Sequence, residues 1–372
     1  MVSPREPALD PLLSGPPTAD ARPQPSRWSE LRLLAAGPII AAFTVIAALI
    51  ACDRAGVSFR DPDHVAALYI LEVGAGVALM IAIDIYIRAA RRNGTRRPTR
   101  TMLGAIRGER WTASRLAAVA SSIVAFYVTY LAYRNLKSLP PLLRPDVLFD
   151  SQLADVDRFL FFGNDPAALL HALFGTGVAA HVFSTLYAAF IVFLPLSLGV
   201  ALVFAERIQF SLFYAAALCV NWVLGAATYF MLPSLGPVYS DPDAFSELPR
   251  TLVTHLQEML MDDRVAFLAD PATGTPQAIA AFASLHIAMS FSAVLVAHWL
   301  DVGRRFKQIL WAWLVLTILA TVYLGWHFVV DDIAGIAMGA AALYIARWIT
   351  GFDPRAARAA GGAPAGAAGT GP

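Results

Sequence analysis

Long apolar runs alternate with short polar segments along most of the chain. Eight of these runs approach the roughly 20 apolar residues that an α-helix needs to cross a bilayer. The pattern therefore predicts an all-α protein, a polytopic integral membrane helical bundle with about eight transmembrane helices. The expected spans are residues 31–51, 64–88, 113–134, 178–204, 209–232, 279–300, 308–324 and 326–349.

Segments of different composition border the apolar runs. Residues 1–27 hold seven prolines and few large apolar residues, which predicts a disordered tail. The first apolar run begins only near Leu31, so we expect no signal peptide. The Ala/Gly-rich residues 351–372 are also expected to be disordered. Between these tails we expect three transmembrane helices over 28–134 and a second membrane domain over 135–350.

The composition agrees with a membrane location. The chain is 58% hydrophobic and 15% charged, whereas charged residues make up about 25% of a soluble protein. The net charge of +1 gives no reason to expect a nucleic-acid partner. Cys52 and Cys219 lie in or beside predicted spans and match no metal-binding spacing, so we expect buried apolar thiols.

Positive residues gather in the loops on one side of the expected bundle. Eight arginines lie between Arg88 and Arg110, and the loops after the fourth, sixth and eighth spans add more arginine and lysine. Cytoplasmic loops carry such an excess, so we expect a multi-pass protein of the cell membrane with both termini in the cytoplasm. Loops 135–177 and 233–278 then lie on the extracytoplasmic side.

Both extracytoplasmic loops hold more than connecting residues. In 135–177, Asp165-Pro166 has the form of an N-cap followed by a first-turn proline, and nearby apolar residues repeat with helical spacing. We expect short helices there, lying either in the membrane interface or against the bundle. Loop 233–278 holds seven carboxylates, which either hydrogen-bond a polyhydroxylic or cationic headgroup or form a solvated lid: Asp241, Asp243, Glu247, Glu258, Asp262, Asp263 and Asp270.

Two polar clusters lie at the edges of apolar runs. His327 and Asp331 are four residues apart, so on a helix they share one face. Gly325 is expected to break the chain before that helix. This places His327 in the first turn, where free backbone N–H groups attract phosphate. A histidine held there by a carboxylate is a candidate nucleophile toward phosphorus. Ser284 and His286 are a candidate phosphate ligand and general acid.

Structural roles compete with these assignments. A histidine in an apolar protein usually has only a structural role, as a hydrogen-bonded group. Ionisable groups at membrane edges, however, are candidates for function. The two clusters are also expected on the same side of the membrane. Glu72 and Asp84, inside the second span, lie about 120° apart around a helix. That separation favours contacts between helices over a proton or ion pathway.

The two clusters resemble motifs of the type 2 phosphatidic acid phosphatase superfamily, which has Lys-x6-Arg-Pro, Pro-Ser-Gly-His and Ser-Arg-x5-His-x3-Asp. This chain has Ala-Ser-Leu-His at 283–286 and His-x3-Asp at 327–331. It is more similar to the inositol phosphorylceramide synthase branch (the inositolphosphotransferases). That branch has Phe-Pro-Ser-Leu-His, Tyr-Leu-x-x-His-x-x-x-Asp and an upstream proline-rich turn like Pro233–Pro237. Asp157–Gly163 resembles the run before the family core, so the resemblance covers about 150–350.

The resemblance implies a role for each residue of the clusters. His327 would attack the phosphorus and form a phosphohistidine, and Asp331 would orient His327. His286 would protonate the leaving group and then deprotonate the acceptor. Ser284 would hold a phosphate oxygen. The chemistry would use no metal and no other cofactor, because cationic side chains neutralise the phosphoryl oxygens.

The chain departs from the family pattern in ways that concern those cations. Ala283 replaces the proline of the second motif, and Ala320-Thr321 stands where the third motif has Ser-Arg. A phosphate-binding arginine is therefore missing, a loss that the transferase branch shares. Lys137, followed after six residues by Arg144-Pro145, matches the first motif literally, although two spans separate it from the family position. Arg264 is the other candidate cation.

These observations predict a membrane-embedded enzyme that acts on lipid substrates at the extracytoplasmic face. The first hypothesis is a phosphotransferase that moves an inositol-phosphate-like headgroup between lipids. The alternative within the same chemistry is a lipid phosphatase acting on polyprenyl phosphate or phosphatidate. A non-catalytic transporter or scaffold is less favoured, because the chain has no internal repeat and its ionisable clusters lie at one membrane edge. The headgroup, the acceptor and the oligomeric state have no signature in the sequence.

Overall fold

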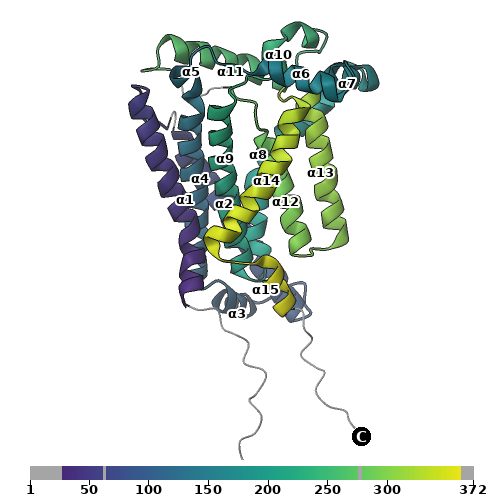
Figure 1. Ribbon diagram of the computed structural model, residues 1–372. Helices are drawn as coiled ribbons and strands as arrows, with labels where there is room; N and C mark the ends of the chain where they lie inside the picture. Colours follow the sequence, from purple (N-terminus) through teal and green to yellow (C-terminus); the bar gives the residue numbers. More distant parts are fainter. Residues whose placement is uncertain (1–26, 62–63, 275–278, 362–372) are drawn as a thin grey trace, which may run out of the picture.

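The computed structural model describes residues 27–61, 64–274 and 279–361. Within these ranges the chain forms helices and no strand (Figure 1). In chain order they are α1 (Arg27–Arg54), α2 (Val65–Arg92), α3 (Arg100–Arg110), α4 (Ala113–Ser138), α5 (Pro140–Leu143), α6 (Asp150–Leu160), α7 (Pro166–Phe174), α8 (Val178–Phe204), α9 (Ile208–Met231), α10 (Pro237–Ser240), η3 (Pro242–Phe245), α11 (Leu252–Ala269), α12 (Leu285–Trp299), α13 (Arg304–Tyr323), α14 (Val329–Thr350) and α15 (Pro354–Gly361).

The predicted all-α membrane bundle is confirmed. In the described part of the chain, seven helices are long and apolar enough to cross a membrane: α1, α2, α4, α8, α9, α13 and α14. The predicted span 279–300 is instead the 15-residue helix α12, which begins only at Leu285. The residues just before it are not helical, because Ala281 and Phe282 donate hydrogen bonds to Ser234 of a neighbouring loop.

Helix α9 lies at the centre of the bundle. Every residue from Ser211 to Trp222 is buried, and α4, α12 and α14 pack around it. A helix that is apolar on all sides is expected at such a place. The peripheral helices α1 and α2 instead expose large apolar side chains, among them Phe43 and Leu71. Such an exposed apolar surface suits contact with lipid.

The two ends of the bundle differ in character. The short helices α5, α6, α7 and α10, together with α11, lie across one end, and the arginine-rich α3 lies at the other (Figure 1). At the α3 end, the buried Asp84 carboxylate accepts hydrogen bonds from Arg88, Arg110 and Trp111. Asp84 therefore joins α2 to α3, as the sequence predicted, whereas Glu72 is exposed.

The two long loops contain regular structure. Short helices were predicted in 135–177, and α6 and α7 confirm them; the Asp165 side chain caps α7 by accepting from Ala168 N at 3.1 Å. Segment 233–278 includes the 18-residue helix α11, capped at its start by Thr251. The sequence analysis treated this segment as a loop and did not predict this helix.

The chain ends lie partly outside the described residues. The undescribed ends are residues 1–26 and 362–372. They make up most of the two expected disordered tails. Helix α15 occupies Pro354–Gly361, within the second tail. It lies at the same end of the bundle as α3 (Figure 1).

Helices α12 and α14 approach each other unusually closely. Gly335 and Gly339 of α14 face the backbone of α12. A Cβ atom on Gly335 would lie 2.5 Å from Ser284 O, and one on Gly339 would lie 2.3 Å from Ala288 O. Small residues four positions apart allow this packing between membrane helices. The contact places the beginnings of α12 and α14 side by side.

This contact predicts the effect of an added methyl group. Gly335→Ala should lower the stability of the protein in detergent by about 1–3 kcal/mol, because the helices must separate. Gly74→Ala in α2 is the matched control, since a Cβ there meets no atom within 4 Å. Thermal unfolding should show no loss for Gly74→Ala. Equal unfolding temperatures for Gly335→Ala and the wild type would contradict the close contact.

Candidate active site

The structure brings the two predicted histidines together. His286 Nδ1 and His327 Nε2 lie 3.1 Å apart and share a hydrogen bond. The other ring nitrogen of His327, Nδ1, lies 3.4 Å from Asp331 Oδ2. The predicted contact is therefore present, although the two residues do not share a helix face: Asp331 stands behind His327, on the side away from His286.

His327 lies before α14 and not in its first turn. Helix α14 begins at Val329, with Phe328 as the N-cap. Gly325 makes the break that the sequence predicted, because its φ of +72° belongs to the left-handed region that favours glycine. A side chain there would also meet Phe245 at 2.7 Å. His327 thus follows a tight turn and is only 4% exposed.

The start of α14 offers no free phosphate-binding group. The Asp157 carboxylate, from α6, accepts from Val329 N at 2.7 Å and from Val330 N at 2.9 Å. Asp331 accepts from Phe328 N at 3.0 Å. The expectation that a phosphate meets free N–H groups of this helix is therefore wrong, because protein carboxylates already occupy them.

The environment of His327 favours the neutral imidazole. Burial lowers the pKa of His327 to about 3, and the positive charge of Lys137 acts in the same direction. A neutral ring keeps a lone pair on one nitrogen at physiological pH. Because Asp331 lies beside Nδ1, the proton belongs on Nδ1 and the lone pair on Nε2, which faces His286.

Both histidines line a cavity of about 210 Å³. We call it the histidine cavity. Aromatic side chains form much of its wall, and the ring of Tyr187 is stacked on that of Trp326 at 4.9 Å. The His286 ring lies between those of Tyr187 and Phe190, at 5.0 and 4.7 Å. The described residues that line this cavity include no carboxylate.

Two cations from α4 line the histidine cavity, Lys137 and Arg134. Neither forms an ion pair within the described part of the chain, and Arg134 Nη2 is buried without a hydrogen-bond partner there. An unpaired buried guanidinium is costly unless a ligand compensates it. Lys137 was a sequence candidate. Arg134 was missed, although its position one helical turn before Lys137 was a readable signal.

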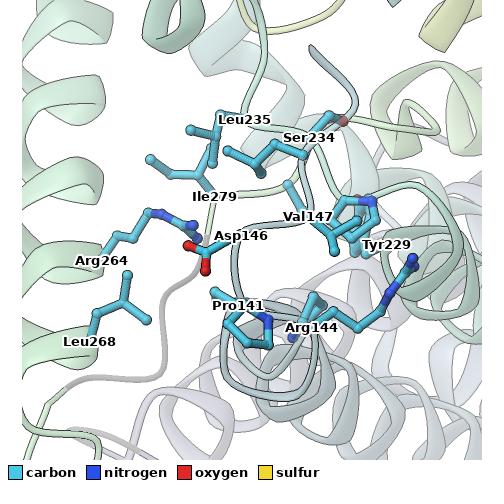
Figure 2. A pocket seen from close by; sticks show the side chains of 15 residues that line it. Pro141, Arg144, Asp146, Val147, Tyr229, Ser234, Leu235, Arg264, Leu268 and Ile279 are labelled. Atoms are coloured by element: carbon cyan, nitrogen blue, oxygen red, sulfur yellow. The ribbon is translucent and has the colours of Figure 1, made fainter. Parts of the chain in front are cut away.

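The other predicted phosphate ligands lie elsewhere. Ser284 is fully buried, does not line the histidine cavity, and donates its N–H to Asp331 O at 3.1 Å. Arg144 donates to Phe230 O and, at 3.0 Å, to Met231 O, so it caps the end of α9. Arg264 lines a second cavity (Figure 2), which shares lining residues with the first.

The acidic residues of segment 233–278 do not reach either cavity. None of its seven carboxylates lines the histidine cavity or the second cavity. The expectation that they grip a headgroup therefore finds no support in the structure. Groups of three or more His, Cys, Asp or Glu side chains that could hold a metal ion are also absent from the residues described.

One comparison with known proteins identifies the family of this chain. The family model of the PAP2 superfamily matches residues 151–345, just over half of the 372-residue chain. The chain belongs to the PAP2 superfamily. This membership indicates lipid phosphatase or phosphotransferase chemistry. The searches among curated proteins and among solved structures gave no match. Helix α4, which supplies both cations, lies outside the matched residues.

The buried neutral His327 predicts how stability depends on pH. In the unfolded chain a histidine binds a proton below about pH 6.5, whereas folded His327 remains neutral down to about pH 3. The unfolded state therefore binds more protons in this window, and stability should fall as the pH falls. Thermal unfolding at pH 7.5 and pH 5.0 should show a smaller drop for His327→Gln than for the wild type.

An exposed histidine provides the control for this measurement. His255→Gln, on α11, should retain the pH dependence of the wild type. If His327→Gln and the wild type lose the same stability on acidification, His327 is not held neutral by burial.

Proposed function

We propose that this chain is a lipid phosphotransferase that moves a phospho-headgroup between lipids through a phosphohistidine on His327. One observation carries the proposal: the two imidazoles lie 3.1 Å apart in a cavity that also holds the unpaired cations Arg134 and Lys137. A nucleophile, a proton donor and cations for the phosphoryl oxygens are what covalent phosphoryl transfer requires. The motif similarity to the inositol phosphorylceramide synthase branch favours transfer over hydrolysis.

The first half-reaction uses both histidines. The phosphate of the donor lipid enters between them and displaces their mutual hydrogen bond. His327 Nε2 then forms a bond to phosphorus, and the P–O bond to the lipid alcohol breaks. His286 donates a proton to the departing oxygen.

The second half-reaction reverses the proton transfer. A hydroxyl group of the acceptor lipid gives its proton to His286, and its oxygen attacks phosphorus. The N–P bond breaks, which restores His327 and yields the transferred product. The lipid phosphatase differs only in that water replaces the acceptor hydroxyl.

Asp331 acts through His327 in this mechanism. Its carboxylate holds the proton on Nδ1 and stabilises the positive charge of the phosphorylated ring. The distance of 3.4 Å is long for a hydrogen bond, but such contacts in ligand-free sites commonly shorten when substrate binds. The buried Ser284 fits a positioning role, because its N–H anchors the Asp331 backbone.

Arg134 and Lys137 take the place of the missing third-motif arginine. Both are free to bind phosphoryl oxygens, and Lys137 belongs to the first-motif match. Arg144 of the same match is committed to the end of α9.

We place the site on the extracytoplasmic side, because it lies at the end of the bundle opposite the arginines of α3 (Figure 1).

The acceptor decides between transferase and phosphatase. Purified protein given a phospho-headgroup lipid alone should turn over slowly, and a second lipid with a free hydroxyl should accelerate turnover and yield the transferred product. His327→Ala should abolish both turnover and an acid-labile phosphoryl-enzyme intermediate. The exposed His255→Ala is the control and should retain wild-type rates. Steady release of phosphate from a lipid monophosphate, unaffected by any acceptor, would establish the phosphatase instead.

The two cations predict a second set of variants. Arg134→Gln and Lys137→Gln should each lower kcat/KM by about 10²–10³-fold, because each removes a charge that stabilises the transition state. Arg92→Gln, an exposed arginine at the opposite end of the bundle, should have no effect. Activity near that of the wild type in both Arg134→Gln and Lys137→Gln would remove α4 from the site.

A further inference from the structure

Two connected hollows lie at the α3 end of the bundle, opposite the histidine cavity (Figure 1). The larger, of about 570 Å³, is lined by residues of α2, α3 and α8 and by the residues that follow α8. The smaller, of about 380 Å³, is lined by the end of α2 and the turn after it. Ile87 and Arg91 line both. We call the two together the arginine hollow.

The carboxylates that line the arginine hollow are already paired with arginines. Asp84 accepts from Arg88 at 2.7 Å and from Arg110 at 3.0 Å. Glu206 accepts from the same two arginines, at 2.8 and 3.4 Å. The formal charges of these four groups cancel, so the net charge of the hollow is set by its remaining arginines.

Two of the remaining arginines carry unpaired charge. The side chains of Arg91 and Arg96 have no hydrogen-bond or ion-pair partner within the described ranges of the chain. Arg92 also lines the larger hollow, but its Nη1 lies 2.6 Å from Glu109 Oε2, so its charge is committed. The arginine hollow therefore offers two free guanidinium groups, one from α2 and one from the turn after it.

The turn that carries Arg96 is fastened to α2. The Tyr86 hydroxyl donates to Arg96 O at 2.7 Å, and Asn93 Nδ2 donates to Ala89 O at 2.8 Å. Arg96 is thereby held beside the hollow before any ligand binds. Such preorganisation reduces the free energy that binding must spend on ordering the protein.

The walls of the arginine hollow are apolar where they meet the surface of the bundle. Ile87 and Phe204 are each 38% exposed and belong to the surface that suits contact with lipid. Arg91 follows Ile87 by four residues, so it lies about 6 Å further along the axis of α2. An arginine placed just beyond the apolar part of a span reaches the level of the lipid headgroups. A soluble anion would leave the apolar walls without a partner.

We propose that the arginine hollow binds an anionic phospholipid from the leaflet at this end of the bundle. Arg91 and Arg96 donate to the phosphate oxygens, and the acyl chains lie along Ile87 and Phe204. Guanidinium groups form paired hydrogen bonds with phosphate, and arginines clustered next to a membrane helix attract anionic lipid. The inference does not depend on the proposed function, because it concerns the opposite end of the bundle.

Lipid titration tests this assignment without any turnover. The probes are phosphatidylglycerol and phosphatidylcholine with identical acyl chains, added to the purified full-length protein in a neutral detergent. Binding to the folded state raises the unfolding temperature and so reports an apparent Kd. The wild type should bind phosphatidylglycerol at least about tenfold more tightly, because each arginine near anionic lipid contributes a factor of about five. Arg91→Gln and Arg96→Gln should each reduce this preference to about twofold.

An exposed arginine at the beginning of α13 provides the matched control. Arg305 lines neither part of the arginine hollow, so Arg305→Gln should keep the preference of the wild type. Equal affinity of the wild type for the two lipids overturns the assignment. A preference that survives both Arg91→Gln and Arg96→Gln also overturns it.

Amide hydrogen exchange shows where the lipid binds. Phosphatidylglycerol should slow exchange over residues 93–110 by at least about fivefold and leave α11, at the other end of the bundle, unchanged. Protection of α11 without protection of 93–110 places the lipid elsewhere and overturns the assignment. Inorganic phosphate in large excess should not displace the lipid. Displacement by phosphate would show a site for free anions and would exclude a role for the apolar walls.

Discussion

The close contact between α12 and α14 is the constraint on which the site depends. These helices run in the same direction with α13 between them in sequence, so both begin at the same end of the bundle. Helix association in a membrane relies on close packing, because lipid is as apolar as the helix surfaces. Gly335 and Gly339 allow an approach that any side chain would block. As a result His286, in the first turn of α12, lies within hydrogen-bonding distance of His327, just before α14.

Two buried aspartates on α6 hold the surrounding loops. Asp150 binds the backbone of the Pro233–Pro237 turn, and Asp157 binds the beginning of α14. This arrangement satisfies donors that would otherwise be unpaired at a helix end, but it also removes them from the set of groups that can bind phosphate. In the proposed mechanism the positive charge for a phosphoryl group comes from side chains, and Arg134 and Lys137 of α4 line the histidine cavity. The proposed mechanism therefore depends on a helix that lies outside the matched family residues.

Local patterns in the sequence predicted the local features. The length of the apolar runs predicted the bundle, the spacing of His327 and Asp331 predicted their contact, and Gly325 predicted the turn between α13 and α14. Features that depend on which helices pack together had a weaker signal or none. Arg134 resembles an ordinary charge at the end of a span, and only the packing of α4 beside α9 places it in the cavity. The role of Asp157 was hidden for the same reason, because its partners lie 172 positions further along the chain.

The lining of the histidine cavity bears on how water is excluded. The histidine cavity is walled by aromatic rings, and electrostatic interactions strengthen where water is scarce. Tyr229 lines this cavity and the second cavity, and its hydroxyl lies 3.3 Å from that of Tyr133. In the proposed mechanism, a phosphohistidine that still carries its headgroup would fill much of this space. Water would then have little access to the phosphorus until the acceptor arrives, so the bound headgroup would itself favour transfer over hydrolysis.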